Sequence, residues 1–263
     1  MSESMITTRR DDAILFVGLD RPEKRNALNR QVLAELTAVL DDAECNADVR
    51  ALVLHGEGKV FSAGVDFAML QGDVAGTDRT PFRRRVGGMQ DTLTRIERLE
   101  KPVIAALHRY VPGLALELAL ACDVRVATSD CELGLPEVRL GLVPDVGGTT
   151  RLVRTVGHAR AKELIMTGRM IGAEQALAIG LVSEVVPVGE HLAAAARIAG
   201  EMAANAPLAV GLAKRLVDLV HDADKHSSLE LELLVQSVLK RTDDAREGAR
   251  AAAERRPPRF QGR

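Results

Sequence analysis

Two glutamates in the middle of the chain, Glu117 and Glu137, are the side chains best suited to chemistry. Pro112-Gly113 opens an apolar run that places Glu117 near the start of a predicted helix, where the first N–H groups lack partners within the helix. The helix dipole there favours negative charge, so this helix end could hold a developing oxyanion. Leu114 lies three residues before Glu117 and shares a helix face with it. One turn could therefore offer an N–H donor and a carboxylate to the same substrate.

Glu137 supplies a second carboxylate, twenty residues further along, in a turn that follows Pro136. Two carboxylates that face one substrate suit general acid–base catalysis, because different surroundings can separate their pKa values. Each residue alone is also typical of ordinary structure: Glu117 as a solvated carboxylate or as one in the N-terminal turn of a helix, and Glu137 as part of a charged turn. The two glutamates indicate catalysis only together with the motifs around them.

Short apolar strands alternate with helices through the first 185 residues, which predicts an α/β fold. Continuous apolar runs predict buried strands, and apolar residues three or four apart predict helices. The predicted strands are 14–19, 51–55, 103–107 and 123–127, and the predicted helices are 31–44, 82–99 and 113–122. Glu117 would then lie on a helix that connects two buried strands.

The C-terminal part of the chain has a different character, with helix signals and no convincing strand beyond Pro187. We therefore predict a core of residues 1–190 that holds the site and a C-terminal helical region of residues 191–263 that serves packing and oligomerisation. This region has more apolar residues than one isolated helix needs, namely Leu229, Leu231, Leu233, Leu234, Val238 and Leu239. We expect the core or another subunit to bury them.

Composition excludes several classes of function. The net charge of −2 gives no basic field for nucleic acid or anionic membrane, and an aromatic content of 2% argues against base-stacking surfaces. The three cysteines have no zinc-site spacing, so we expect no metal and free thiols in a reducing compartment. With no secretory signal and no run of 18 apolar residues, the expected location is the cytoplasm, without a membrane span.

Several motifs, in consistent order from about residue 14 to 260, together resemble one protein family. They are Arg21-Pro-Glu-Lys-Arg-Asn-Ala-Leu28, Phe61-Ser-Ala-Gly-Val-Asp66, Lys101-Pro-Val-Ile-Ala-Ala106, Glu117-Leu-Ala-Leu-Ala-Cys-Asp123, Pro136-Glu137, Gly147-Gly-Thr-Thr-Arg-Leu152, Leu164-Ile-Met-Thr-Gly168 and Gly180-Leu-Val-Ser-Glu-Val185. This ordered set resembles the enoyl-CoA hydratase/isomerase (crotonase) superfamily, and the hydratases most. The resemblance implies a crotonase-like spiral of ββα units with a C-terminal helical region, and a homotrimer or homohexamer. It also implies an acyl-CoA thioester substrate and no separate cofactor, because CoA is part of that substrate.

The resemblance also implies roles for particular residues. The backbone N–H groups of Val65 and Leu114 would form an oxyanion hole for the thioester carbonyl, and Glu117 and Glu137 match the two catalytic glutamates of the hydratases. The residues that would border CoA are Arg25, Ala27, Leu28, Ala63, Gly64 and Asp66. Water added at the β-carbon of an enoyl thioester would create an enolate that the two N–H groups stabilise.

This sequence departs from the family pattern at three places. Gly113-Leu114-Ala115 stands where the hydratases usually have three glycines; a helix-start φ is compatible with Leu, but its side chain could narrow the thioester site. His108-Arg109 replaces the usual Asn-Gly, and His108 is expected to fill space, while Arg109 could pair with a carboxylate or a CoA phosphate. Asp145 stands where hydratases commonly have glycine, either as a third acid for a proton shuttle or as a cap or turn residue before a helix that starts at Gly147-Gly148.

These observations lead to one function and two alternatives. The favoured prediction is an enoyl-CoA hydratase, a lyase that reversibly converts a 2-enoyl-CoA to a 3-hydroxyacyl-CoA in fatty acid metabolism. The first alternative is an enoyl-CoA or dienoyl-CoA isomerase that uses Glu137 and Asp145. The second is a non-catalytic acyl-CoA binding protein. For Lys214, an exposed lysine is favoured over one that reaches the CoA phosphate of a neighbouring subunit.

Overall fold

The large sheet forms the centre of the molecule in a computed structural model that describes residues 4–74, 80–221 and 223–263. In this part of the chain the strands follow the order β1-β2-β3-β4-β6-β9; β1 is antiparallel to β2, and the other pairs are parallel. The strands are β1 (Ile6–Asp11), β2 (Ile14–Leu19), β3 (Ala51–Gly56), β4 (Val103–Leu107), β6 (Val124–Thr128) and β9 (Glu184–Val186). The four strands predicted from the sequence are β2, β3, β4 and β6.

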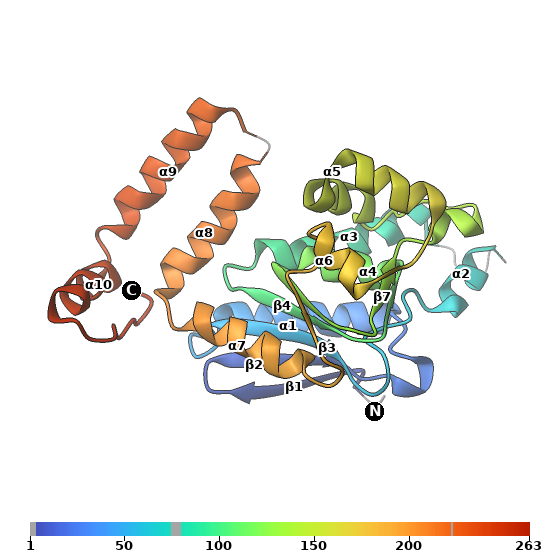
Figure 1. The fold of residues 1–263 in the computed structure, drawn as a ribbon, viewed down its shortest axis with the longest axis horizontal. Coiled ribbons are helices and arrows are strands. Elements are labelled where there is room, and N and C mark those ends of the chain that lie inside the picture. Colours follow the sequence, from blue (N-terminus) through green and yellow to red (C-terminus); the bar gives the residue numbers. More distant parts are fainter. Residues whose placement is uncertain (1–3, 75–79, 222) are drawn as a thin grey trace.

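Helices cover both faces of this sheet, which explains why β3 and β4 are buried along their whole length. Leu52 and Leu54 point to the face packed by α1 (Arg30–Cys45), α3 (Phe82–Arg98) and α4 (Leu114–Ala121). Ala51 and Val53 point to the opposite face, which α7 (His191–Ala203) covers. The predicted helices 31–44, 82–99 and 113–122 are therefore confirmed as α1, α3 and α4, and they form one layer above the sheet (Figure 1).

A small second sheet determines where the two glutamates lie. It consists, among the described residues, of β5 (Tyr110–Pro112), β7 (Glu132–Gly134) and β8 (Ile171–Gly172). β5 and β7 are parallel, with Pro112 opposite Gly134, and the Gly113 N–H donates to the Gly134 carbonyl at 2.8 Å. Parallel strands end at the same edge, so the chain that leads to Glu117 and the chain that leads to Glu137 leave the sheet side by side.

Two further elements lie near that edge. The 3-10 helix η2 (Glu137–Leu140) begins at Glu137, and α5 (Gly148–Thr167) carries the glycine pair 147–148 at its start. The remaining short elements are α6 (Ala173–Ala178), which follows β8, and η1 (Pro22–Lys24) and α2 (Phe67–Val74) in the N-terminal half. Helix α5 is kinked at Gly157, whose φ of 77° and ψ of 164° are not helical.

The C-terminal helices divide into two groups. Helix α7 begins at the predicted boundary and buries Ala195 and Ala199 against the sheet. Beyond it come α8 (Pro207–Val220), α9 (Lys225–Leu239) and α10 (Asp243–Glu254). Helices α8 and α9 pack on each other and extend away from the sheets (Figure 1). No helix in the described ranges is long and apolar enough to cross a membrane.

Candidate active site

The backbone N–H groups of Val65 and Leu114 lie close together at the start of α4. Val65 forms an isolated parallel bridge with Leu28, and a Cβ on the preceding Gly64 would lie 2.7 Å from the Pro112 carbonyl oxygen and 3.7 Å from the Leu114 nitrogen. Within the described part of the chain, neither the Val65 nor the Leu114 N–H donates to a backbone or side-chain acceptor. The two groups are thus close together and available to an external oxygen, as an oxyanion hole requires.

The segment before Val65 is held in place by Asn26. Its side-chain amide donates to the carbonyls of Glu57, Val60 and Phe61 at 2.7, 2.9 and 3.2 Å, and the backbone carbonyl of Asn26 accepts from the Ser62 hydroxyl at 2.7 Å. Asn26 is 2% exposed and adopts a φ of 56°, a region that asparagine tolerates better than most residues. The buried side-chain amide of Asn26 therefore connects its own segment with residues 57–61, which lead to Val65.

The residues predicted to border CoA form a connected strip along these segments. Leu28 donates to the Gly64 carbonyl at 2.7 Å and accepts from the Asp66 N–H at 2.8 Å, and the Ala63 N–H donates to the Arg25 carbonyl at 2.9 Å. Leu28 is fully buried and Ala27 is 9% exposed, so their side chains belong to the core.

The charged residues of this strip differ in their partners. The Asp66 carboxylate is bound by the Arg21 guanidinium at 3.0 Å, which also donates to the Ala27 carbonyl at 2.7 Å. Asp66 is therefore used for structure, whereas the exposed Arg25 side chain projects from a residue with a φ of 51°. Arg25 is the cation of the strip that could meet a phosphate.

Glu117 is buried at 2% exposure, so the alternative of a solvated carboxylate is wrong, although the residue does lie in the first turn of α4, as the other alternative had it. Its Oε1 accepts from the N–H groups of Val146 and Gly148 at 2.9 and 2.8 Å. Burial raises the pKa of Glu117 to about 7, with a further contribution from the nearby charges of Glu137 and Asp145, although the two N–H donors oppose the shift. A carboxyl with a pKa near neutrality can both take and return a proton at physiological pH.

Glu137 lies on the other side of Gly113. Its Oε1 is 2.8 Å from the position that a Cβ on Gly113 would occupy, so the carboxyl approaches the backbone directly before Leu114. Its Oε2 is buried and has no hydrogen-bond partner in the described part of the chain. Burial, and then the charge of Asp145, raise the pKa of Glu137. This surrounding favours the protonated form of the carboxyl.

Asp145 completes a group of three acids. The alternative role as a helix cap is wrong, because the N-cap of α5 is Gly147 and no side chain caps it. The Asp145 carbonyl accepts from the Gln90 side chain at 2.6 Å, and the Asp145 charge raises the pKa values of both Glu117 and Glu137. No group of His, Cys, Asp and Glu in the described residues could hold a metal ion.

Comparison with known proteins identifies the family of this chain. The family model described as enoyl-CoA hydratase/isomerase matches residues 9–263. The chain belongs to the enoyl-CoA hydratase/isomerase family. It is similar to 2,3-dehydroadipyl-CoA hydratase of Escherichia coli, with 36% identity over the full length of both chains. It is also similar to short-chain-enoyl-CoA hydratase of Clostridium acetobutylicum, with 36% identity over 97% of each chain.

The fold comparison gives the same result. A crystal structure of enoyl-CoA hydratase from Bacillus anthracis superposes with a TM-score of 0.93 at 37% identity, covering 98% of this chain and 100% of the other. A structure of an enoyl-CoA hydratase from Polaromonas sp. JS666 has a TM-score of 0.92 at 32% identity and covers 97% and 99%. The crotonase-like α/β fold with a C-terminal helical region, expected from the motifs, is therefore confirmed.

The departures from the usual hydratase/isomerase pattern have structural explanations. Leu114 is 4% exposed and its side chain is part of the main hydrophobic core, so the residue packs inward from the helix start. Arg109 adopts a φ of 62°, a conformation that glycine takes without strain, and pairs with Asp130 at 3.3 Å. His108 is 9% exposed, lies 3.3 Å from the Gly58 carbonyl and stacks on His191, so it fills space as expected.

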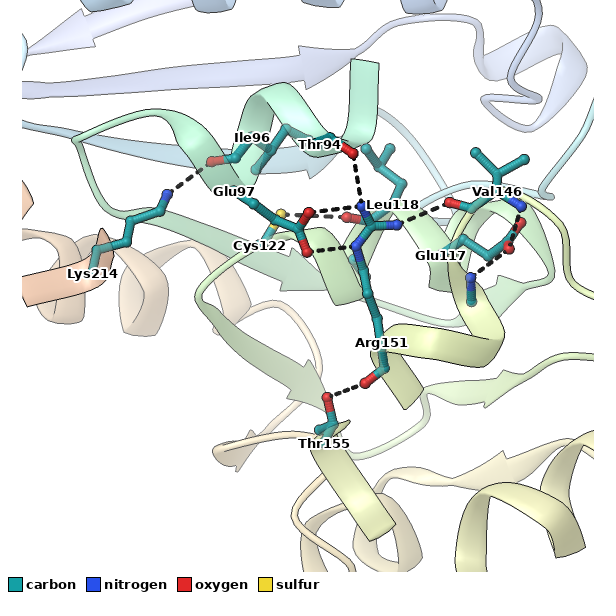
Figure 2. A network of polar contacts seen from close by, with 12 residues as sticks. Thr94, Ile96, Glu97, Glu117, Leu118, Cys122, Val146, Arg151, Thr155 and Lys214 are labelled. Atoms are coloured by element: carbon teal, nitrogen blue, oxygen red, sulfur yellow. Dashed lines mark hydrogen bonds and ion pairs between the residues drawn. The ribbon is translucent and has the colours of Figure 1, made fainter. Parts of the chain in front are cut away.

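The prediction for Lys214 was wrong. Its side chain is 8% exposed, pairs with Asp123 at 2.9 Å and donates to the carbonyls of Ile96 and Lys101 (Figure 2 shows the Ile96 contact). A lysine with three acceptors at the junction of α8 and α3 fastens these helices to each other.

The sequence motifs also missed the groups that hold Glu117. The N–H groups of Val146 and Gly148 converge on its carboxylate, and the Arg151 side chain reaches the Val146 carbonyl (Figure 2). Backbone donors have no residue-type signal, so they become visible only in the fold. The one available signal was the glycine pair 147–148: a Cβ on Gly148 would lie 2.7 Å from the Glu117 Oε1.

Proposed function

We propose that the protein adds water reversibly across the 2,3 double bond of a 2-enoyl-CoA thioester to give a 3-hydroxyacyl-CoA. The observation that carries the proposal is the placement of Glu117 and Glu137 beside the available N–H groups of Val65 and Leu114. Its relatives include proteins named as hydratases of 2,3-dehydroadipyl-CoA and of short-chain enoyl-CoA, and these names support the same reaction type. CoA belongs to the substrate, so the reaction uses no separate cofactor.

The two N–H groups act on the charge that the reaction creates. The thioester carbonyl withdraws electrons from the conjugated double bond and makes the β-carbon electrophilic. When water attacks that carbon, negative charge moves to the thioester oxygen and an enolate forms. The N–H groups of Val65 and Leu114 donate to this oxygen, and because both are fixed by the fold they stabilise the enolate with little reorganisation.

We assign the roles of the two carboxyls from their surroundings. The two N–H donors on Glu117 Oε1 offset part of the effect of burial, so that with a pKa of about 7 a share of Glu117 is ionised at neutral pH, and they leave Oε2 for a water molecule. Glu117 acts as the base that removes a proton from the attacking water. Glu137 is half-buried with an unpartnered oxygen, which favours its protonated form. It acts as the acid that delivers a proton to the α-carbon of the enolate.

The test follows the absorbance of the conjugated enoyl thioester in crotonyl-CoA. The wild-type protein is expected to consume it, and Glu117→Gln and Glu137→Gln are each expected to lower kcat by roughly 10²- to 10⁴-fold. Glu174→Gln, at an exposed glutamate in the first turn of α6, is the matched control and should retain full activity. Acyl-CoA binding without turnover of any enoyl-CoA would refute the proposal and indicate a non-catalytic acyl-CoA binding protein.

Asp145 favours a second candidate, an isomerase that moves a double bond along an enoyl or dienoyl chain. Its charge raises the pKa values of both glutamates, which supports a place for Asp145 beside the same site. In that reaction Glu137 is the main base and Asp145 its partner. Turnover of a dienoyl-CoA that survives Glu117→Gln but is lost in Asp145→Asn would establish isomerisation in place of hydration.

A further inference from the structure

Arg151, in the first turn of α5, lies at the centre of a polar network behind Glu117 (Figure 2). Its Nε and Nη2 donate to the two carboxylate oxygens of Glu97 on α3 at 2.7 and 2.9 Å. Its side chain is 10% exposed and that of Glu97 is 32% exposed. Two parallel N–H···O bonds fix the plane of the guanidinium more firmly than one bond could.

The remaining nitrogen of this guanidinium, Nη1, reaches the loop that holds Glu117. Arg151 Nη1 donates to the Val146 carbonyl at 2.9 Å, and the N–H of the same residue donates to Glu117 Oε1, also at 2.9 Å. Val146 is therefore held on one side by Arg151 and on the other side binds the carboxylate. The contacts run in an unbroken order from Glu97 through Arg151 and Val146 to Glu117 (Figure 2).

Gly147 makes room for this arrangement. An ideal Cβ at position 147 would lie 1.9 Å from Arg151 Nη1, so any other residue would displace the guanidinium. The φ of Gly147 is 98°, a conformation that residues with a side chain rarely adopt. Gly147 thus leaves space for the Arg151 side chain, in addition to being the N-cap of α5.

We propose that Arg151, held by Glu97, is a positioning residue that keeps the Val146 N–H on Glu117 and so holds the catalytic carboxylate in its working orientation. Arg151 does not touch the substrate. It acts through one backbone N–H, which must lie within hydrogen-bond distance of Oε1 while Oε2 faces the water. The expected effect on kcat rests on the proposed hydration reaction. The expected effect on the orientation and pKa of Glu117 does not.

Loss of Arg151 has a predictable effect on proton affinity. The Val146 N–H stabilises the ionised form of Glu117 and lowers its pKa. If Val146 moves away, the carboxylate loses that donor, and the pKa of Glu117 rises. The ionised base then becomes available only at higher pH, so the acid limb of the rate profile moves toward higher pH by about one unit, the effect of one hydrogen bond to a charged group.

The first experiment measures kcat and KM for crotonyl-CoA across pH in Arg151→Gln. We expect kcat to fall roughly 10- to 100-fold with KM within about twofold, because the group that shifts is the base and not a binding contact. Arg151→Lys keeps a charge but cannot bind Glu97 twice and Val146 at once, so it should restore part of the rate. Arg160→Gln, an exposed residue paired with Glu163 on the same helix, is the matched control and should behave as wild type.

Two further measurements separate positioning from a general structural role. In a Glu117→Gln background, Arg151→Gln should cause no additional loss of kcat, because its effect passes through Glu117. If Arg151→Gln folds poorly, Glu97→Gln tests the same network by weakening the fork, and it should shift the acid limb in the same direction. An equal loss of rate with and without Glu117, or an unchanged acid limb in folded variants, would overturn the proposal.

A titration that does not need turnover keeps the inference independent of the reaction. Protein labelled with 13C at the glutamate carboxyl is titrated by NMR, and the Glu117 signal is assigned by its loss in Glu117→Gln. The wild-type midpoint should lie near 7 and rise in Arg151→Gln. Absence of crotonyl-CoA turnover in the wild type would refute the proposed function alone, whereas equal midpoints in the two proteins would refute the role of Arg151 alone.

Discussion

Glu117 and Glu137 carry the same functional group but have different surroundings at the scale of single residues. Two N–H donors hold one oxygen of Glu117, whereas an oxygen of Glu137 is buried without a partner among the described residues. Both pKa values are raised, first by burial. These side chains were identified from motifs, but their distinct proton affinities depend on neighbours that lie about ten to thirty residues away in sequence, among them Asp145, Val146 and Gly148.

The raised pKa of Glu117 predicts how Glu117→Gln changes stability with pH. The folded value of about 7 lies above the ordinary value of 4.5, so the folded state holds a proton that the unfolded state releases between these values. The wild type therefore loses stability as pH rises from about 4.5 to about 7, on the order of 3 kcal/mol, and the neutral glutamine does not. Urea unfolding at a series of pH values should show that the free energy of unfolding of Glu117→Gln rises relative to that of the wild type over this pH range. A constant difference would contradict the assignment.

Gly113 provides a second test at this scale. In Gly113→Ala the new methyl group would lie 2.8 Å from Glu137 Oε1, at a residue with a φ of 53°. We expect a loss of about 1 to 3 kcal/mol of stability from backbone strain and a large fall in kcat, because both Glu137 and the Leu114 N–H shift. Gly200→Ala on α7, where a Cβ meets nothing within 4 Å, is the control and should not lose stability. Equal activity in Gly113→Ala and wild type would show that Glu137 does not act beside Gly113.

At the scale of elements, the site depends on two parallel strands. β5 and β7 pair in register, and their ends deliver Glu117 and Glu137 to the same edge. The strands of the large sheet were predictable because their apolar runs are continuous, whereas three-residue strands such as β5 and β7 contain no periodic signal. Pairing between segments about twenty residues apart is decided by the fold.

Helix α7 carries a second pH response at its first turn. His191 stacks on His108 with ring centroids 4.6 Å apart, and their Nδ1 atoms have no partner in the part of the chain that is described. Burial, followed by the charges of His108 and His55, lowers the pKa of His191 to about 4. The unfolded state therefore binds more protons than the folded state as pH falls below about 6.5, and acid weakens the attachment of α7.

The prediction for this element concerns His191→Gln. Wild-type stability should fall as pH drops from about 6.5 toward 4, and the variant should lose roughly 1 to 2 kcal/mol less, a figure reduced because His191 is partly exposed. The change of stability with pH has the opposite sign to that expected for Glu117, so each variant is compared with the wild type at the same pH. Chemical unfolding at a fixed protein concentration measures the free energy of unfolding of each protein. His158→Gln, at an exposed histidine of α5, should show no such difference.

At the scale of the whole molecule, the helices beyond α7 present apolar side chains to solvent. On α9 the exposed fractions are 48% for Leu229, 64% for Leu233, 63% for Leu234 and 55% for Val238, and Val217 on α8 is 69% exposed. Helices α8 and α9 extend away from the sheets (Figure 1). The expectation that the core buries these four α9 side chains is therefore wrong. Such a surface is typical of a protein interface, and its burial by another subunit stays a prediction.

Sedimentation should therefore detect a species three or six times the 28.3 kDa mass of the chain. Replacement of Leu233 and Leu234 by glutamate places charge in the apolar surface and should shift the protein toward smaller species. Glu232→Gln, at the exposed residue directly before Leu233, is the matched control and should leave the mass unchanged. A wild-type protein that sediments as one 28.3 kDa chain at micromolar concentration would rule out the trimer and the hexamer.

The amino-acid sequence alone determined the α/β class, the positions of the long helices and buried strands, and the family, because these depend on local periodicity and on motifs contiguous in the chain. The identities of Glu117, Glu137 and the segment 61–66 belong to the same kind of information. Only the tertiary structure decided that Val146 and Gly148 hold Glu117, that Arg151 holds Val146, and that Lys214 is buried. Backbone donors and ion pairs between distant segments exist only after folding brings them together, and they carry no pattern that a linear chain could display.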